Sequence, residues 1–155
     1  MMKLIALALS LTLLTGCTWS AGPLMLWGSG NAVILSEDAD RFYADGMDAF
    51  HRTDYALAQE KFQAAVEANP KMAAAWLGLA GSYDYLRRFD LADRAYREVE
   101  RLTGPTPSLL NNRGYSHYLQ GNLVKARALY EEAARLAPND PIIAANIEML
   151  HARKL

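Results

Sequence analysis

Apolar and small residues recur along residues 37–140 at a fixed spacing of 34 positions. Large, small and aromatic residues each keep their own place within this period. The aligned sets are Phe42, Trp76 and Leu110; Gly46, Ala80 and Gly114; Tyr55, Phe89 and Leu123; Ala58, Ala92 and Ala126; Phe62, Tyr96 and Tyr130; and Ala65, Val99 and Ala133, with Pro70 and Pro138 two periods apart. Self-similarity of this length predicts stacked units that bury their apolar faces only against each other.

The order of residue types within the period resembles the tetratricopeptide repeat, in which each unit is a pair of antiparallel helices. Many Leu and Ala residues with few Val and Ile residues also favour helices over sheet. We therefore expect an all-α fold, an α-solenoid of three repeats followed by a capping helix. The expected units are repeat 1 at 37–70, repeat 2 at 71–106, repeat 3 at 107–140 and the capping helix at 141–155.

The small and aromatic positions have predictable packing roles. Gly46, Ala80 and Gly114 are expected where the two helices of a unit cross closely, opposite the alanines at 58, 92 and 126. The aromatic residues at 62, 96 and 130 are expected to fill the space between repeats.

Polar residues and prolines predict where helices begin. Ser36 is expected to cap the first helix, and Thr106 with Pro107 to start the third unit. The same arrangement at 139–141 precedes a last helix that we expect from Ile142 to about Arg153.

The N-terminal residues form a separate unit. Lys3 precedes an uncharged run from Leu4 to Leu14, which is too short to span a bilayer and is typical of an export signal. A buried N-terminal helix is the alternative, but the run is apolar on every face and is followed directly by Gly16.

The end of this run carries the only cysteine of the chain. Leu14, Thr15, Gly16 and Cys17 resemble the lipobox of bacterial lipoprotein precursors. The resemblance implies a signal peptide at 1–16, cleavage before Cys17, lipid attached to its thiol and a tether at 17–36. Thr18 follows the cysteine, where Gram-negative lipoproteins kept in the inner membrane often have Asp. The expected location is therefore the periplasmic side of the outer membrane.

Charge and motifs exclude several functions. Sixteen basic against 17 acidic residues show no excess that would bind nucleic acid. His51, His117 and His151 have no metal-ligand spacing, and we predict that His117 is packed and hydrogen-bonded. No catalytic or phosphate-binding motif is present. We expect neither an enzyme nor a cofactor, apart from the lipid on Cys17.

The first helices of tetratricopeptide repeats line a concave surface, which implies a groove for a protein or peptide partner. Alternatively, 24–27 or 33–35 covers this groove, or two chains share it. The expected groove residues are Tyr43, Met47, Phe50, His51, Leu77, Asp84, Tyr85, Asn111, Tyr115, Tyr118 and Leu119.

Residues 73–99 and 107–141 most resemble the TadD family, assembly factors of tight-adherence (Flp) pili. This resemblance implies a pilotin- or chaperone-like lipoprotein whose partner is an outer-membrane secretin or pilus component. Three alternatives stay open: a general envelope scaffold that recruits peptidoglycan or division enzymes, a purely structural dimer, and an enzyme of unknown type.

Overall fold

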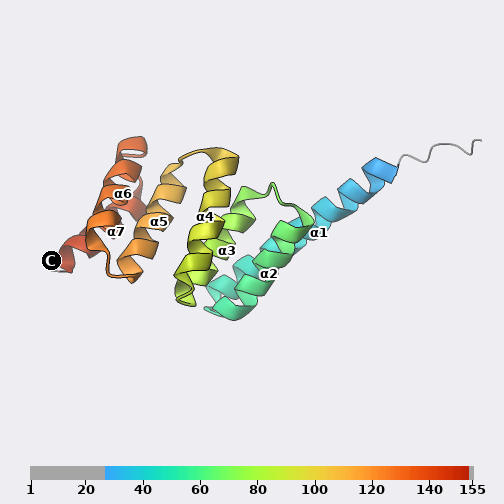
Figure 1. The fold of residues 1–155 in the computed structure, drawn as a ribbon, viewed down its shortest axis with the longest axis horizontal. Helices are drawn as coiled ribbons and strands as arrows, with labels where there is room; N and C mark the ends of the chain where they lie inside the picture. Colours follow the sequence, from blue (N-terminus) through green and yellow to red (C-terminus); the bar gives the residue numbers. More distant parts are fainter. Residues whose placement is uncertain (1–26, 154–155) are drawn as a thin grey trace, which may run out of the picture.

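The computed structural model describes residues 27–153, and for residues 27–36 it describes the backbone alone. This part of the chain contains seven helices and no strand (Figure 1). The helices are α1 (Trp27–His51), α2 (Tyr55–Ala68), α3 (Ala73–Tyr85), α4 (Phe89–Thr103), α5 (Pro107–Leu119), α6 (Leu123–Leu136) and α7 (Pro141–Ala152). The expected all-α solenoid is confirmed.

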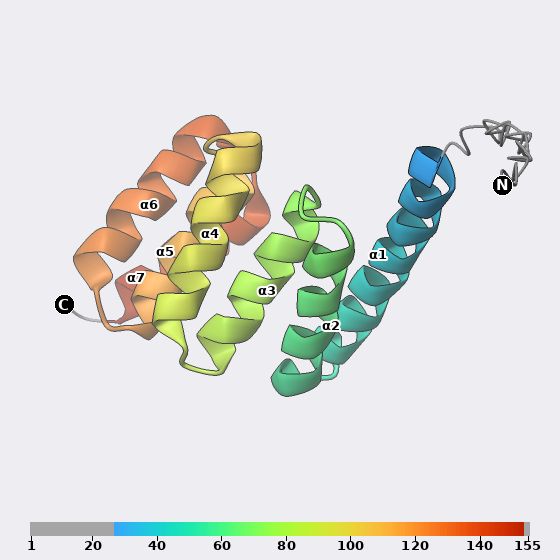
Figure 2. The same ribbon diagram turned by 45° about the vertical axis from the view of Figure 1, so that its right-hand side comes forward.

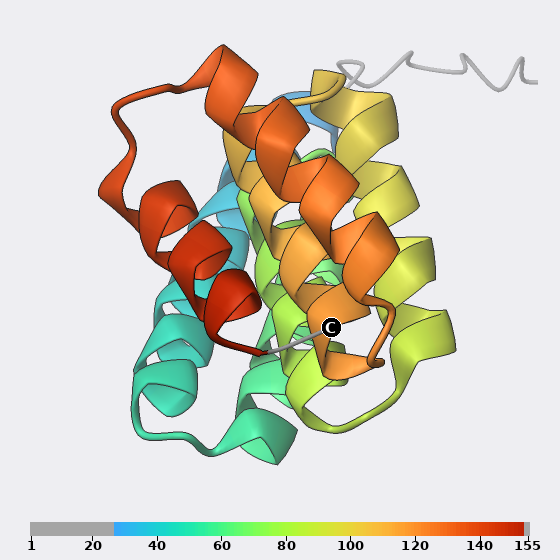
Figure 3. The ribbon, with the colours of Figure 1, turned by 90° about the vertical axis from the view of Figure 1, so that its left-hand side faces the viewer.

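Consecutive helices pack as antiparallel pairs, and the pairs stack side by side. Helices α1 and α2, α3 and α4, and α5 and α6 form the three hairpins (Figure 2). The final helix, α7, packs against α5 and α6 at the C-terminal end of the stack (Figure 3). Each pair therefore contacts its neighbours alone, as expected for a solenoid.

An aromatic ring from α2 separates the first two pairs. The Phe62 side chain is fully buried between Gly46 of α1 and Gly78 of α3. A Cβ atom built on either glycine would lie 2.7 or 2.6 Å from the ring, closer than real Cβ atoms approach their neighbours. The predicted role of Phe62 between repeats is confirmed, and glycine is what allows the ring to lie there.

The predicted partners of the small residues are correct in part. Ala58, Ala92 and Ala126 are fully buried, as expected for close helix crossings. Gly46 and Gly114, however, contact the rings of Phe62 and Tyr130 in the second helix of the same pair. The space beside each glycine is thus filled by an aromatic ring of the second helix, which lies four residues after the buried alanine of that helix.

The predicted starts of α5 and α7 are confirmed. Thr106 Oγ1 accepts a hydrogen bond from the Leu109 amide at 3.2 Å, and Pro107 is the first residue of α5. Asp140 Oδ1 accepts from the amides of Ile142 and Ile143 at 2.8 and 3.2 Å. These acceptors satisfy amides that have no partner within the helix.

The predicted start of the first helix is wrong. Helix α1 begins at Trp27, so Ser36 is an interior residue and 27–36 is not an irregular tether. Gly28 and Gly30 each cost about 1 kcal/mol in a helix, but the residues from Asn31 to Ser36 contain no helix breaker. Once α1 is nucleated against α2, each further residue adds a backbone hydrogen bond. The signal peptide at 1–16 and the rest of the expected tether lie outside the described residues.

Gly78 and Gly81 provide a matched test of the packing around Phe62. We expect Gly78→Ala to destabilise the protein by about 1–3 kcal/mol, because the added methyl group meets a ring held on all sides. Gly81→Ala should instead stabilise it by about 0.5–1 kcal/mol, since its Cβ would lie 3.5 Å from Phe50, an ordinary contact. Thermal or urea unfolding measures both. Equal stabilities of the two variants would contradict this packing.

Candidate functional site

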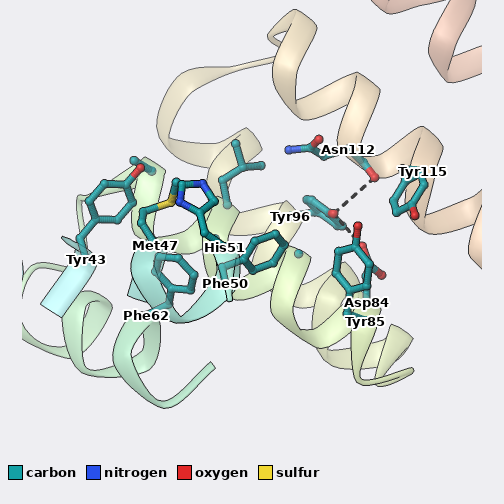
Figure 4. A pocket seen from close by; sticks show the side chains of 14 residues that line it. Tyr43, Met47, Phe50, His51, Phe62, Asp84, Tyr85, Tyr96, Asn112 and Tyr115 are labelled. Carbon is teal, nitrogen blue, oxygen red and sulfur yellow. Dashed lines mark hydrogen bonds between the residues drawn. The ribbon is translucent and has the colours of Figure 1, made fainter. Parts of the chain in front are cut away.

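The first helices of the three pairs, α1, α3 and α5, line a cavity of about 400 Å³ (Figure 4). Eight of the eleven predicted groove residues line it: Tyr43, Met47, Phe50, His51, Leu77, Asp84, Tyr85 and Tyr115. The structure adds six lining residues: Phe62, Ala74, Gly78, Gly81, Tyr96 and Asn112.

The added residues explain why the cavity is open. Ala74 and Gly81 lie on α3 and have little or no side chain to fill the space between neighbouring helices, whereas the space beside Gly78 is taken by the Phe62 ring. Phe62 and Tyr96 come from α2 and α4 and reach between the first helices. The sequence prediction considered inward positions of the first helices alone, so it did not include rings that arrive from the second helices.

A row of aromatic rings continues along the cavity from the first pair to the last. Tyr55 and Tyr85 stack with ring centroids 4.2 Å apart, and Phe50 contacts both edge-on at 5.2 and 5.4 Å. Tyr85 lies 6.0 Å from Tyr115, which stacks at 6.0 Å on the Tyr118 ring. Tyr55 was not predicted as a groove residue because it begins α2, although it belongs to an aligned position of the 34-residue period. Adjacent rings hold each other in place and present apolar surface of fixed shape.

Three predicted groove residues lie outside the cavity. Asn111 is buried and accepts a hydrogen bond from Asn146 of α7 at 2.8 Å. The Tyr118 ring packs with Leu150 of α7 and has the Arg153 guanidinium 4.9 Å from its centre. The third residue, Leu119, is half-buried and is not part of the cavity wall. Helix α7 thus contacts Asn111 and Tyr118 on the surface of α5 where a fourth repeat would stack.

Asp84 forms a buried polar cluster at the junction of the second and third pairs. Its carboxylate is 1% exposed and accepts hydrogen bonds from Tyr96 Oη at 2.7 Å and Ser116 Oγ at 2.6 Å. Burial raises the pKa of Asp84 to about 6, although both hydrogen bonds act in the opposite direction. The sequence prediction placed Asp84 on the groove surface, whereas it lies in the cavity floor and links α3, α4 and α5.

The corresponding position in the third pair lacks this cluster. The Tyr130 hydroxyl is buried and has no hydrogen-bond partner among the described residues. One period after Asp84 the chain has Tyr118, which has no carboxylate, and one period after Ser116 it has Leu150, which has no hydroxyl group. Tyr96 and Tyr130 therefore share a period position but differ in whether the hydroxyl is satisfied.

The described residues contain no group of three or more His, Cys, Asp or Glu side chains placed to hold a metal ion. None of the helices within 27–153 combines the length and apolar character needed to cross a bilayer. The prediction that His117 is hydrogen-bonded is wrong for one nitrogen, because its Nδ1 is buried without a partner. Burial lowers the pKa of His117, which favours the neutral ring. Leu14, Thr15, Gly16 and Cys17 lie outside the described residues.

Tyr96→Phe and Tyr130→Phe test the polar cluster as a matched pair. We expect Tyr96→Phe to cost about 1.5–3 kcal/mol near pH 8, where Asp84 is ionised and loses a donor. The cost should fall to about 1 kcal/mol near pH 5, because the hydrogen bond stabilises the ionised form and Asp84 is protonated below its raised pKa. Tyr130→Phe should be neutral or stabilising at both pH values. Urea unfolding of both variants at both pH values measures these changes in the free energy of unfolding. A cost of Tyr96→Phe that does not depend on pH would contradict the polar cluster.

Several solved structures share this fold. The second TPR domain of human RPAP3 in complex with the HSP70 peptide SGPTIEEVD matches with a TM-score of 0.63 and 18% identity, over 77% of this chain and 98% of that one. The Yersinia enterocolitica type III secretion chaperone SycD, in complex with a peptide of the translocator YopD, matches with a TM-score of 0.63 and 19% identity, over 77% of this chain and 97% of that one. Pseudomonas aeruginosa PilF matches with a TM-score of 0.65 and 24% identity, and the matched region spans 55% of the PilF chain.

No curated protein sequence gives a significant match. The profile of the tetratricopeptide repeat matches residues 43–92 and, a second time, residues 82–141. The two matches overlap and together cover residues 43–141, which include most of the described helices. The chain belongs to the tetratricopeptide repeat family.

Proposed function

We propose that this protein is a lipid-anchored, non-catalytic scaffold of the outer membrane whose groove holds a segment of a protein partner. In this proposal it acts as a pilotin- or chaperone-like assembly factor for a tight-adherence pilus or secretion apparatus. The partner is a secretin or another pilus component. Members of the repeat family mediate protein–protein interactions, which supports the general role.

The cavity between α1, α3 and α5 is the observation that carries the proposal. A volume of about 400 Å³ lies within the range of well-formed binding pockets. Its wall is dominated by aromatic and aliphatic side chains, with Tyr85 still 39% exposed. Rings held by their neighbours lose little conformational freedom on binding, so they suit the anchoring of apolar side chains of a peptide.

The structural similarities support a peptide partner. SycD holds a peptide of a secretion translocator, and a TPR domain of RPAP3 holds an HSP70 peptide. The similarity to PilF, a pilus-related protein, supports the narrower assignment to pilus assembly, together with the resemblance of residues 73–99 and 107–141 to the TadD family.

The proposed anchor rests on the lipobox-like residues from Leu14 to Cys17. One acyl chain holds a protein at a membrane weakly and two or more hold it stably, so the proposed cleavage and acylation of Cys17 provide a stable anchor. Residues 18–26 separate Cys17 from the start of α1. Fully extended, a segment of this length reaches about 35 Å, which leaves the repeats close to the membrane.

Crosslinked pull-down from intact envelopes tests the groove. We expect the wild-type chain to capture a secretin or pilus component, and the combined change of Tyr85→Ala and Tyr115→Ala to lose most of it. The control is Val124→Ala with Leu136→Ala, two exposed apolar residues of α6 that do not line the cavity. Capture of peptidoglycan hydrolases instead would favour the general envelope scaffold. Capture that is unaffected by the tyrosine changes would contradict the groove.

The same preparations test the anchor. Cys17→Ser should leave the chain unprocessed by lipoprotein maturation, so that no labelled fatty acid is incorporated. Its repeats should melt at the wild-type temperature. An uncleaved and unlipidated wild-type chain would contradict the proposed anchor without affecting the groove.

A further inference from the structure

We propose that the groove selects a segment whose apolar side chains are flanked by lysine or arginine, and that it discriminates against acidic segments. This inference rests on the proposed peptide-binding function and specifies the chemistry of the partner. It follows from the distribution of charge around the cavity.

The cavity wall itself contains no cationic side chain to receive a carboxylate. None of its 14 residues is lysine or arginine, and His51 is its only histidine. Its one acidic residue is Asp84, whose carboxylate already accepts hydrogen bonds from Tyr96 and Ser116. A peptide carboxylate that entered the cavity would lose water, meet a like charge and gain no ion pair.

Among the helices that line the groove, α1 is acidic, whereas the helices behind the groove are close to neutral in total. Helices α1, α3 and α5 contain six acidic residues and two basic ones. Helices α2, α4 and α6 contain eight acidic residues and seven basic ones. Five of these six acidic residues lie on α1 and the sixth is the buried Asp84 of α3, whereas α5 has none. The exposed negative charge of the lining helices therefore gathers on α1, at one side of the groove, where it attracts cations.

Two exposed carboxylates lie next to the wall residues of α1. Asp40 comes three residues before Tyr43 and seven before Met47, so it shares their face of the helix. Asp48 comes three residues before His51 and lies at the margin of the same face. Neither carboxylate forms an ion pair with another described residue, in contrast to Asp38, which is paired with Arg41. Both are thus available to a cationic partner.

The charge distribution argues against two other occupants. A second copy that docked its groove against this one would offer Asp40 and Asp48 a cavity wall that contains neither lysine nor arginine, so the two carboxylates would gain no ion pair from it. Residues 18–26 of this chain contain no charged residue, so they offer no complement to Asp40 and Asp48. A partner with basic flanks satisfies both the apolar wall and its acidic margin.

Selection from a library of random short peptides on the purified, full-length chain tests this inference and requires no named partner. We expect selected sequences to combine Leu, Ile, Phe or Tyr with Lys or Arg and to be depleted of Asp and Glu. The best selected peptide and a version with each basic residue changed to Glu are then measured by fluorescence anisotropy. We expect the basic peptide to bind at least about tenfold more tightly at low salt and to lose most of this advantage at high salt.

Substitutions on α1 separate the proposed contact from a general charge effect. Asp40→Asn with Asp48→Asn should weaken binding of the basic peptide about three- to tenfold and leave thermal stability unchanged. Asp45→Asn is the matched control, because Asp45 is exposed on the same helix but lies on the side away from Tyr43 and Met47. Asp45→Asn should change the affinity for the basic peptide by less than about twofold.

The outcomes distinguish this inference from the proposed function. Enrichment of acidic peptides, or equal binding of the basic and acidic versions, would overturn the charge preference while keeping a peptide-binding groove. If the binding of every selected peptide is unaffected by changes at Tyr85 and Tyr115, the charge preference and the peptide-binding groove are both contradicted. Two further outcomes would each identify one of the rejected occupants and overturn the inference. The first is displacement of the basic peptide by a synthetic peptide of residues 18–26. The second is a dimer of this chain that dissociates when the basic peptide binds.

Discussion

The aromatic ring that lies between successive first helices is the contact on which the rest of the structure depends. Phe62 lies between α1 and α3 because Gly46 and Gly78 leave room for it. Tyr96 lies at the equivalent place between α3 and α5, where its hydroxyl reaches Asp84 and lies 3.3 Å from the Asn112 carbonyl oxygen. These rings are floor residues of the cavity as well as core residues. The groove is therefore a direct consequence of how the pairs stack, and a change in the stacking would change its shape.

The two junctions are stabilised by different means. The first is apolar, because a phenylalanine ring fills it completely and requires no partner. The second buries a carboxylate with two donors, and breaking such an arrangement by removing one member is costly. The second junction is therefore sensitive to the loss of one hydroxyl, whereas the first depends on volume alone. The polar atoms of the second junction also fix the distance between α3 and α5, which carry Tyr85 and Tyr115 in the groove wall.

The sequence was most informative where a residue type is required by packing within one period. The 34-residue spacing predicted the helix pairs, the buried alanines and the role of Phe62, because each repeat must solve the same packing problem. It predicted the cap at Thr106 because a side-chain oxygen there serves nearby amides. It was less informative where distant elements meet. The contact of α7 with Asn111, the burial of Asp84 and the inclusion of Tyr55 in the aromatic row all depend on contacts outside one repeat. The early start of α1 was missed because glycines weaken a helix without preventing it.

The central claim is that the concave surface holds a partner in the cell. Site-specific photocrosslinking tests it most directly, with a photoreactive phenylalanine derivative in place of Tyr85 in intact envelopes. The same group in place of Val124, which is 75% exposed on α6, serves as the reference position. We expect a discrete crosslinked product at position 85 and none at position 124. No product at position 85, or the same product at both positions, would contradict the claim.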